Sequence, residues 1–213
     1  SVATPIFADF DVTMTTTATE GPIDNSFGII FRLQSQAESA CNLSMIILCD
    51  VANITPILGV PIRLLAPKQS TVESIHYYTF LISSDGYYSV WEVSNGQEKQ
   101  LSAWIPSPII NLDLESENTI RVVARGDQFQ FFINGEQMLV CIPNDKDAVS
   151  TYSGGECLDG TMQTVLTDDS ISRGRIGGAV QSTLTGGGGV VVQFDNIIVF
   201  SPSKNVERAE SNA

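Results

Sequence analysis

The sequence has 213 residues, of which 43% are hydrophobic and 16% charged, and its formal net charge is −13 at pH 7. This hydrophobic content is enough for a sizeable core and suits one large β domain or two small ones. The acidity argues against nucleic acid and anionic membranes as partners, because both are negatively charged, and no apolar run reaches the ~18 residues that direct membrane insertion requires.

Hydrophobic residues alternate with polar ones along short segments in the first half of the chain. This period of two is typical of strands that have one face on a core and the other partly in water. The residues predicted to face the core are, in chain order, Phe10, Val12, Met14, Ile29, Phe31, Leu33, Tyr78, Phe80, Ile82, Tyr87, Ser89 and Trp91.

The second half continues in the same way. Three strands, over residues 119–125, 128–133 and 136–141, are predicted to form a meander, because Gly126-Asp127 and Asn134-Gly135 tolerate the positive φ angles of hairpin turns. A last strand contains Val190, Val192 and Phe194. We expect it to neighbour the first strand and so cover a sheet edge.

Two segments break this rhythm, at about 36–74 and 143–173. The sequence therefore predicts an all-β fold, a single antiparallel two-sheet jelly-roll sandwich over residues 1–200 with two long loop excursions. Residues 201–213 are polar and are predicted to form a tail or linker.

The cysteines fall into two local pairs, Cys41 with Cys49 in the first excursion and Cys141 with Cys157, which begins just before the second excursion and ends within it. An even number of cysteines without metal-binding spacing favours disulfides and an oxidising compartment, although four buried free thiols are the alternative. We predict local pairing within each excursion; the two other pairings are non-local.

Three segments resemble the concanavalin A-like lectin/glucanase superfamily, in particular its domains related to 3-keto-disaccharide hydrolases (laminin G-like). They are IDNSFGIIFR, ENTIRVVARGDQFQFFINGEQM, and GRIGGAVQS followed by VVVQFDNIIVF. The resemblance implies a concanavalin A-like sandwich and a function related to carbohydrate. It departs from the enzymes of the superfamily, because HYYTFLIS contains no carboxylate and no E-x-D-x-x-E strand is present.

Sugars bind to aromatic rings, which stack on the apolar face of a pyranose, and to planar polar groups, which bond its hydroxyls. The residues predicted to face away from the core and to bind a ligand are Arg32, Gln34, Tyr77, Thr79, Tyr88, Glu92, Arg121 and Gln130, together with Trp104 in the loop WIPSP. The alternative is that these residues lie under the excursions and form a second small core.

Catalytic and metal-binding patterns are weak. Glycoside hydrolysis needs two carboxyl groups ~5–10 Å apart; Glu73, Asp159 or Asp168 in the excursions, or Glu92 with an acid from a loop, are candidates without a motif. No cofactor motif is present, and calcium at Asp195 is the only metal site that we consider.

We therefore predict a non-catalytic recognition module of a secreted or cell-surface protein that binds carbohydrate. Two alternatives remain. One is a glycosidase-like hydrolase acting on a disaccharide or glucan, and the other is a protein-interaction scaffold. The expected partner is a glycan or a protein.

Overall fold

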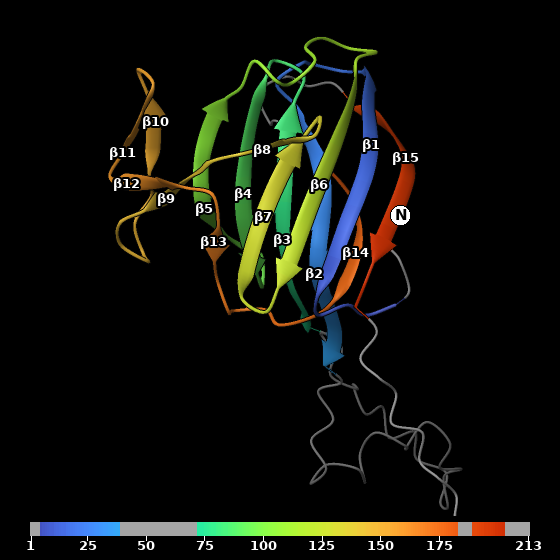
Figure 1. Cartoon of the computed structure of the whole chain (residues 1–213). Coiled ribbons are helices and arrows are strands. Elements are labelled where there is room, and N and C mark those ends of the chain that lie inside the picture. Colours follow the sequence, from blue (N-terminus) through green and yellow to red (C-terminus); the bar gives the residue numbers. More distant parts are fainter. Residues whose placement is uncertain (1–4, 39–71, 183–188, 203–213) are drawn as a thin grey trace, which may run out of the picture.

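The structure is a computed structural model that describes residues 5–38, 72–182 and 189–202. Two antiparallel sheets face each other, as the front and rear layers of Figure 1 show. Sheet A contains, in spatial order, β14 (Arg175–Gln181), β2 (Ser26–Glu38), β3 (Val72–Ser83), β4 (Tyr87–Ser94) and β5 (Gln97–Pro106). Sheet B contains β13 (Leu166–Thr167), β7 (Gln128–Ile133), β6 (Glu117–Arg125), β1 (Phe10–Glu20) and β15 (Val191–Phe200), and β8 (Glu136–Gln137) pairs with β7. The all-β sandwich predicted from the sequence is confirmed.

The first and last strands are neighbours, as predicted. β1 pairs antiparallel with β15, from Asp11 opposite Phe200 to Glu20 opposite Val191. The described ranges contain no helix that is long and apolar enough to cross a membrane.

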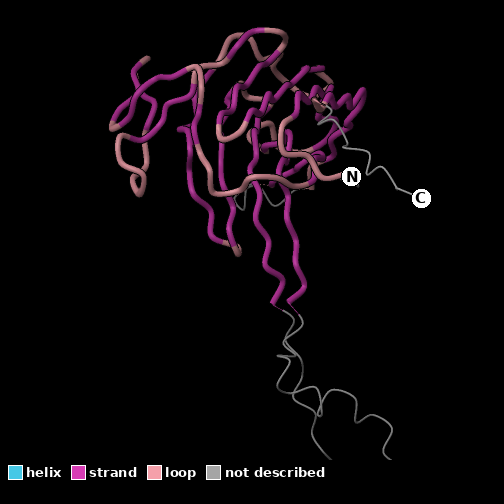
Figure 2. Tube along the Cα trace, turned by 60° about the horizontal axis from the view of Figure 1, so that its bottom comes forward, coloured by secondary structure: helices cyan, strands magenta, loops and turns pink. Residues whose placement is uncertain are grey.

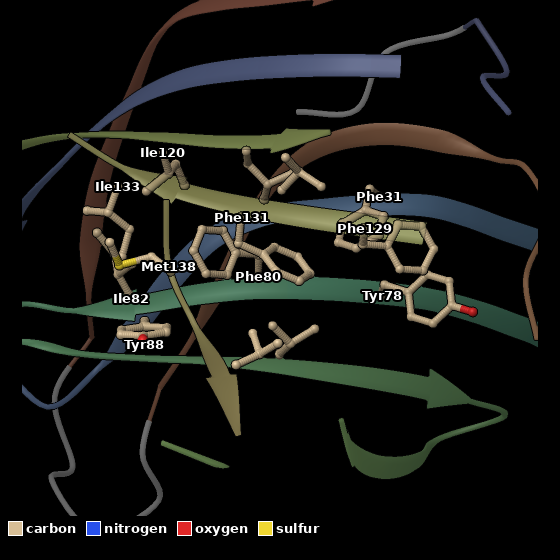
Figure 3. Packing of buried hydrophobic residues seen from close by; sticks show 14 of the residues in the cluster. Phe31, Tyr78, Phe80, Ile82, Tyr88, Ile120, Phe129, Phe131, Ile133 and Met138 are labelled. Atoms are coloured by element: carbon tan, nitrogen blue, oxygen red, sulfur yellow. The ribbon is translucent and has the colours of Figure 1, made fainter. Parts of the chain in front are cut away.

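The core lies between the sheets and is rich in aromatic rings (Figure 3). Phe31 stacks on Tyr78 with ring centroids 5.3 Å apart, and Phe80 meets Phe131 across the sandwich at 4.8 Å. Rings of this size bury ~150–250 Å² each and supply much of the hydrophobic stabilisation. The residues predicted to face the core in β1 and β3 are all buried there.

The predicted meander is correct for its first two strands and wrong for the third. β8 has only two residues, and the chain then leaves sheet B as β9 (Val140–Pro143), which contacts β5 and pairs with β12 (Gly160–Gln163). β10 (Thr151–Ser153) pairs with β11 (Glu156–Leu158) between them. These short strands form an arm beside β5 (Figure 1), so the second excursion is not a simple loop.

A disulfide between Cys141 and Cys157 staples this arm, with Cα atoms 5.6 Å apart. It confirms one of the two predicted local pairs. The other predicted pair, Cys41 with Cys49, lies outside the described residues, as does most of the excursion at 36–74.

β2 and β3 continue beyond the sandwich as a two-stranded extension (Figure 2). Their pairing runs on to Glu38 opposite Val72, whereas β4 ends at Ser94, opposite His76. Among the described residues, the extension therefore has no third strand beside it on the β4 side.

Candidate functional site

Sheet A has an outer face, turned away from the core, that β3 and β4 dominate. Tyr78, Phe80 and Ile82 of β3 are fully buried in the core, so Tyr77, Thr79 and Leu81 point outward. Directly paired residues of an antiparallel sheet share a face. Val93 opposite Tyr77 and Trp91 opposite Thr79 therefore lie on the outer face too.

The phase predicted for β4 is consequently wrong. Tyr88, predicted to bind ligand, is 4% exposed and belongs to the core, where its hydroxyl donates to the Leu139 carbonyl at 2.7 Å. Burial raises the pKa of this Tyr88 hydroxyl well above its usual value. Trp91, which was predicted to face the core, lies on the outer face instead of Tyr88.

A shallow hollow of about 150 Å³ crosses this outer face from β5 to β14, and we call it the first hollow. Its lining residues are Ile30, Tyr77, Thr79, Leu81, Trp91, Val93, Glu98, Ala179 and Gln181. Two of the predicted site residues, Tyr77 and Thr79, thus line the same hollow. The hollow also contains an aromatic ring, that of Trp91, and a carboxylate, that of Glu98, which were not predicted to belong to the site. Burial and the nearby Glu98 carboxylate raise the pKa of Tyr77, so its hydroxyl is a neutral donor and acceptor.

Two polar atoms, on Trp91 of the first hollow and on Gln100 paired with it, have no hydrogen-bond partner among the described residues. The indole N–H of Trp91 is buried and unpartnered, and so is the side-chain carbonyl oxygen of Gln100, the residue paired with Trp91 across β4 and β5. A buried polar atom without a partner costs roughly 1–3 kcal/mol. A small shift of either side chain, a water molecule or a ligand hydroxyl would recover that energy.

A second hollow, of about 180 Å³, lies farther along the same face, where β3 turns into β4. It is lined by Asp24, Ser83, Asp85, Tyr87 and Trp104. Trp104 therefore occupies the outer face of sheet A as a residue of β5 rather than of a loop. Both aromatic residues of this hollow are partly exposed.

Arg121 and Gln130 do not belong to this site. They lie on β6 and β7, on the outer face of sheet B, where the Arg121 guanidinium donates to both carboxylate oxygens of Asp11 at 2.7 and 2.6 Å and stacks over Phe132. The hydrogen bond from Arg121 to Asp11 raises the pKa of the guanidinium. Both residues face away from the core as predicted, but they do not join Tyr77 in one ligand site, because alternation identifies the side of a strand and not its sheet.

Arg32 is also not a surface residue. Its φ of 52° is in the left-handed region, and a β-bulge after Phe31 turns the side chain inward. Arg32 is 1% exposed, and its guanidinium donates to the carbonyl oxygens of Ile171 at 2.6 Å, Ala8 at 3.0 Å and Gly126. Burial lowers its pKa.

The bulge also brings Gly174 against the backbone of Arg32. A Cβ atom on Gly174 would lie 2.2 Å from the Arg32 carbonyl carbon, so only glycine fits there. The bulge ends the core alternation as well, so Leu33, predicted to face the core, is only partly buried and lies outside the core cluster.

The remaining predicted residues, Gln34 and Glu92, gather at one end of the sandwich. The Gln34 amide donates to the Arg173 carbonyl at 2.7 Å, and the Lys99 ammonium lies 3.9 Å from Glu92. Asp168 accepts hydrogen bonds from the Tyr78 hydroxyl at 2.5 Å and from the Ser170 amide at 2.9 Å.

The pKa values of Glu92 and Asp168 are shifted in opposite directions. The Ser170 hydroxyl lies within hydrogen-bonding reach of both groups. Burial and the Asp168 charge raise the pKa of Glu92. Burial also acts to raise the pKa of Asp168, but the hydrogen bonds from Tyr78 and Ser170 outweigh it and the pKa is lowered.

A cavity of about 440 Å³ adjoins this pair, between β5, β9 and the segment around β13. Lys99 and Asp168 line it, together with Asp127, Asp145, Lys146 and Asp169. Among the described residues, no group of three or more His, Cys, Asp or Glu side chains is placed to hold a metal ion. Asp195, the predicted calcium ligand, is exposed on β15 opposite Thr15.

No protein-family profile matches the sequence, and no curated protein matches it. Among solved structures, the carbohydrate-binding module CBM66 from Bacillus subtilis is similar with a TM-score of 0.50 and 12% identity, over 94% of this chain and 80% of that one. A Bacillus subtilis protein of unknown function with a galectin-like fold has a TM-score of 0.48 and 15% identity, over 93% and 74% of the two chains. At this identity the similarity to CBM66 establishes the fold alone, a lectin-like jelly-roll sandwich.

Proposed function

We propose that this chain is a non-catalytic carbohydrate-recognition module and that its ligand binds on the outer face of sheet A. The observation that supports this is the first hollow, where the rings of Tyr77 and Trp91 lie beside a hydroxyl, a carboxylate and the Gln181 amide. Rings offer stacking surfaces and the polar groups offer partners for sugar hydroxyls. The fold is shared with a protein described as a carbohydrate-binding module.

The affinity is expected to be low. The first hollow, at about 150 Å³, is smaller than the ~300–1,000 Å³ typical of sites for drug-sized ligands. Each polar group must also release water before it bonds to a sugar. We expect dissociation constants from high micromolar to millimolar, on the order of −4 to −6 kcal/mol.

A glycan array followed by titration calorimetry tests the proposal. Tyr77→Ala and Trp91→Ala should each weaken binding by about 5- to 30-fold, as expected for a ring that contributes ~1–2 kcal/mol. Gln130→Ala, on the outer face of sheet B, is the matched control and should bind like the wild type. No binding to any glycan would contradict the proposal and favour the protein-interaction scaffold.

The disulfide of the arm supports a location of this module outside the reducing cytosol. Disulfides persist in secreted and surface-exposed proteins, and the Cys141–Cys157 bond links β9 to β11 within the arm. We infer that the protein works in an oxidising compartment, as a secreted or cell-surface protein. Thiol labelling of the protein in cell extracts would contradict this if Cys141 and Cys157 react as free thiols.

One observation favours a second candidate function, glycoside hydrolysis at the end of the sandwich. Two carboxyl groups of opposite pKa tendency, Glu92 and Asp168, suit the roles of acid and of base or nucleophile in that chemistry. Glu92, however, does not line the adjacent cavity. Release of reducing sugar by the wild type that is lost in both Glu92→Gln and Asp168→Asn would establish an enzyme and refute the non-catalytic module.

A further inference from the structure

Both hollows on the outer face of sheet A combine aromatic rings with carboxylates. The first has Tyr77 and Trp91 with Glu98, and the second has Tyr87 and Trp104 with two aspartates, Asp24 and Asp85. The three acidic residues are exposed. Among the described residues, neither hollow is lined by a lysine, arginine or histidine.

The two hollows are arranged along the strands. Thr79 lines the first and Ser83 the second, four residues apart on β3, which corresponds to ~13 Å at ~3.3 Å per residue. Trp91 and Tyr87 are separated by the same number of residues on β4. Since Tyr77 and Ser83 are six residues apart, the row spans roughly 20 Å. A single sugar ring cannot occupy both hollows, but a chain of several rings can.

The negative charge of this face restricts which class of oligosaccharide can bind. In the part of the chain that the structure describes, no cationic residue lines either hollow beside these carboxylates, and the protein as a whole carries a net charge of −13. The Glu98 carboxylate acts on the site itself, since it is one of the two causes that raise the pKa of Tyr77. A polymer of uronic or sialic acids would be repelled here, whereas a polymer with ammonium groups would be attracted.

We propose that this face binds an amino-sugar oligosaccharide, of the glucosamine type with protonated amines, which lies along β3 and β4 with one ring over each hollow. This inference rests on the proposed carbohydrate binding and adds the class and the length of the ligand. The rings provide the stacking surfaces, and Glu98, Asp24 and Asp85 provide the charge partners.

Titration calorimetry with three tetrasaccharides in mildly acidic buffer tests the class of ligand. The tetramers are built from glucosamine, N-acetylglucosamine and glucose, and only the first is charged. An exposed ion pair contributes up to ~1 kcal/mol, about fivefold in affinity, so two or three pairs predict about 5- to 50-fold tighter binding of the glucosamine tetramer at low salt. The preference should shrink in 1 M salt, where the screening length is ~3 Å.

Three variants test which residues cause the preference for the glucosamine tetramer and whether the site extends over both hollows. Glu98→Gln should reduce the preference about two- to fivefold, whereas Glu136→Gln, an exposed glutamate on β8 of sheet B, should leave it unchanged. Trp104→Ala should weaken binding of the tetramer but not of the glucosamine monomer or dimer.

The outcomes separate this inference from the function on which it rests. Binding of none of the tetramers would overturn the amino-sugar inference, and the glycan array would then decide whether carbohydrate binding itself stands. Equal binding of all three, or a preference that Glu98→Gln and Glu136→Gln reduce alike, would overturn the amino-sugar inference and leave carbohydrate binding in place. A tetramer affinity that Trp104→Ala does not change would refute the extended site.

Discussion

Replacement of Arg32 by methionine tests whether this residue is structural. Methionine has a similar length but no donor, so the carbonyl oxygens of Ala8, Gly126 and Ile171 would lose their partner. A hydrogen bond from a charged donor contributes ~1.5–3 kcal/mol. Loss of the buried charge offsets part of this, because burial itself disfavours the guanidinium. We expect the free energy of unfolding to fall by about 2–4 kcal/mol.

Arg121 provides a matched control for this measurement. Both arginines stack on a phenylalanine ring, at 4.7 Å for Arg32 over Phe129 and 4.8 Å for Arg121 over Phe132. The Arg121 side chain, however, is 41% exposed. Arg121→Met should therefore cost less than ~1 kcal/mol, as for other surface ion pairs.

Urea unfolding followed by tryptophan fluorescence provides the comparison, with the slope of the transition checked for each variant. A cost for Arg32→Met within about 1 kcal/mol of that for Arg121→Met would refute the structural role of Arg32. If Arg32→Met kept the stability of the wild type and lost glycan binding instead, Arg32 would return to the ligand site, as the sequence alone predicts.

Three further predictions follow from the same structure. Joint replacement of Cys141 and Cys157 by alanine should lower the free energy of unfolding by up to ~3 kcal/mol, as expected for a sequence separation of 16, and a value near zero in urea titrations would be evidence against a stabilising staple. Folding raises the pKa of Glu92, so this side chain favours the folded state most at low pH and loses that contribution as the pH rises through its folded pKa. Glu92→Gln should therefore gain stability relative to the wild type as the pH rises above about 4, and a constant difference would contradict the raised pKa. Val90→Asp should prevent folding while Trp91→Asp leaves a folded protein by circular dichroism, and the reverse result would show that the outer face of β4 is misassigned.

Two strands of sheet B, β1 and the first part of β7, are predictable because one side of each is clearly polar. In β1, Phe10, Val12 and Met14 alternate with Asp11 and threonines, so only one phase can face the core. β7 is similar near its start, where Phe129 and Phe131 flank Gln130. The period of two then fixes the orientation of the whole strand.

Arg32 could not be placed from the sequence, for a local reason. A bulge adds one residue to a strand and moves the following side chains to the other face. Here it occurs at a non-glycine residue with a φ of 52°, and no Asn-Gly or Gly-rich pattern marks it. The carbonyl oxygens that bind the guanidinium come from Ala8, Gly126 and Ile171, which the fold alone brings together.

The orientation of β4 was predicted wrongly, for a reason that is connected to the proposed function. Its sequence, YYSVWEVS, has apolar or aromatic residues in both phases, Tyr88 and Val90 toward the core and Tyr87 and Trp91 toward the outside. A sheet that binds sugar through aromatic rings must carry such rings on its wet face, and these rings erase the alternation that identifies the core. The signal that survives is the pairing register. Ile82 opposite Tyr88 and Phe80 opposite Val90 place the phase of β4 by that of β3, whose core face is unambiguous. In a sheet of this kind, orientation is therefore better inferred from the hairpin partner than from the hydrophobic pattern of the strand itself.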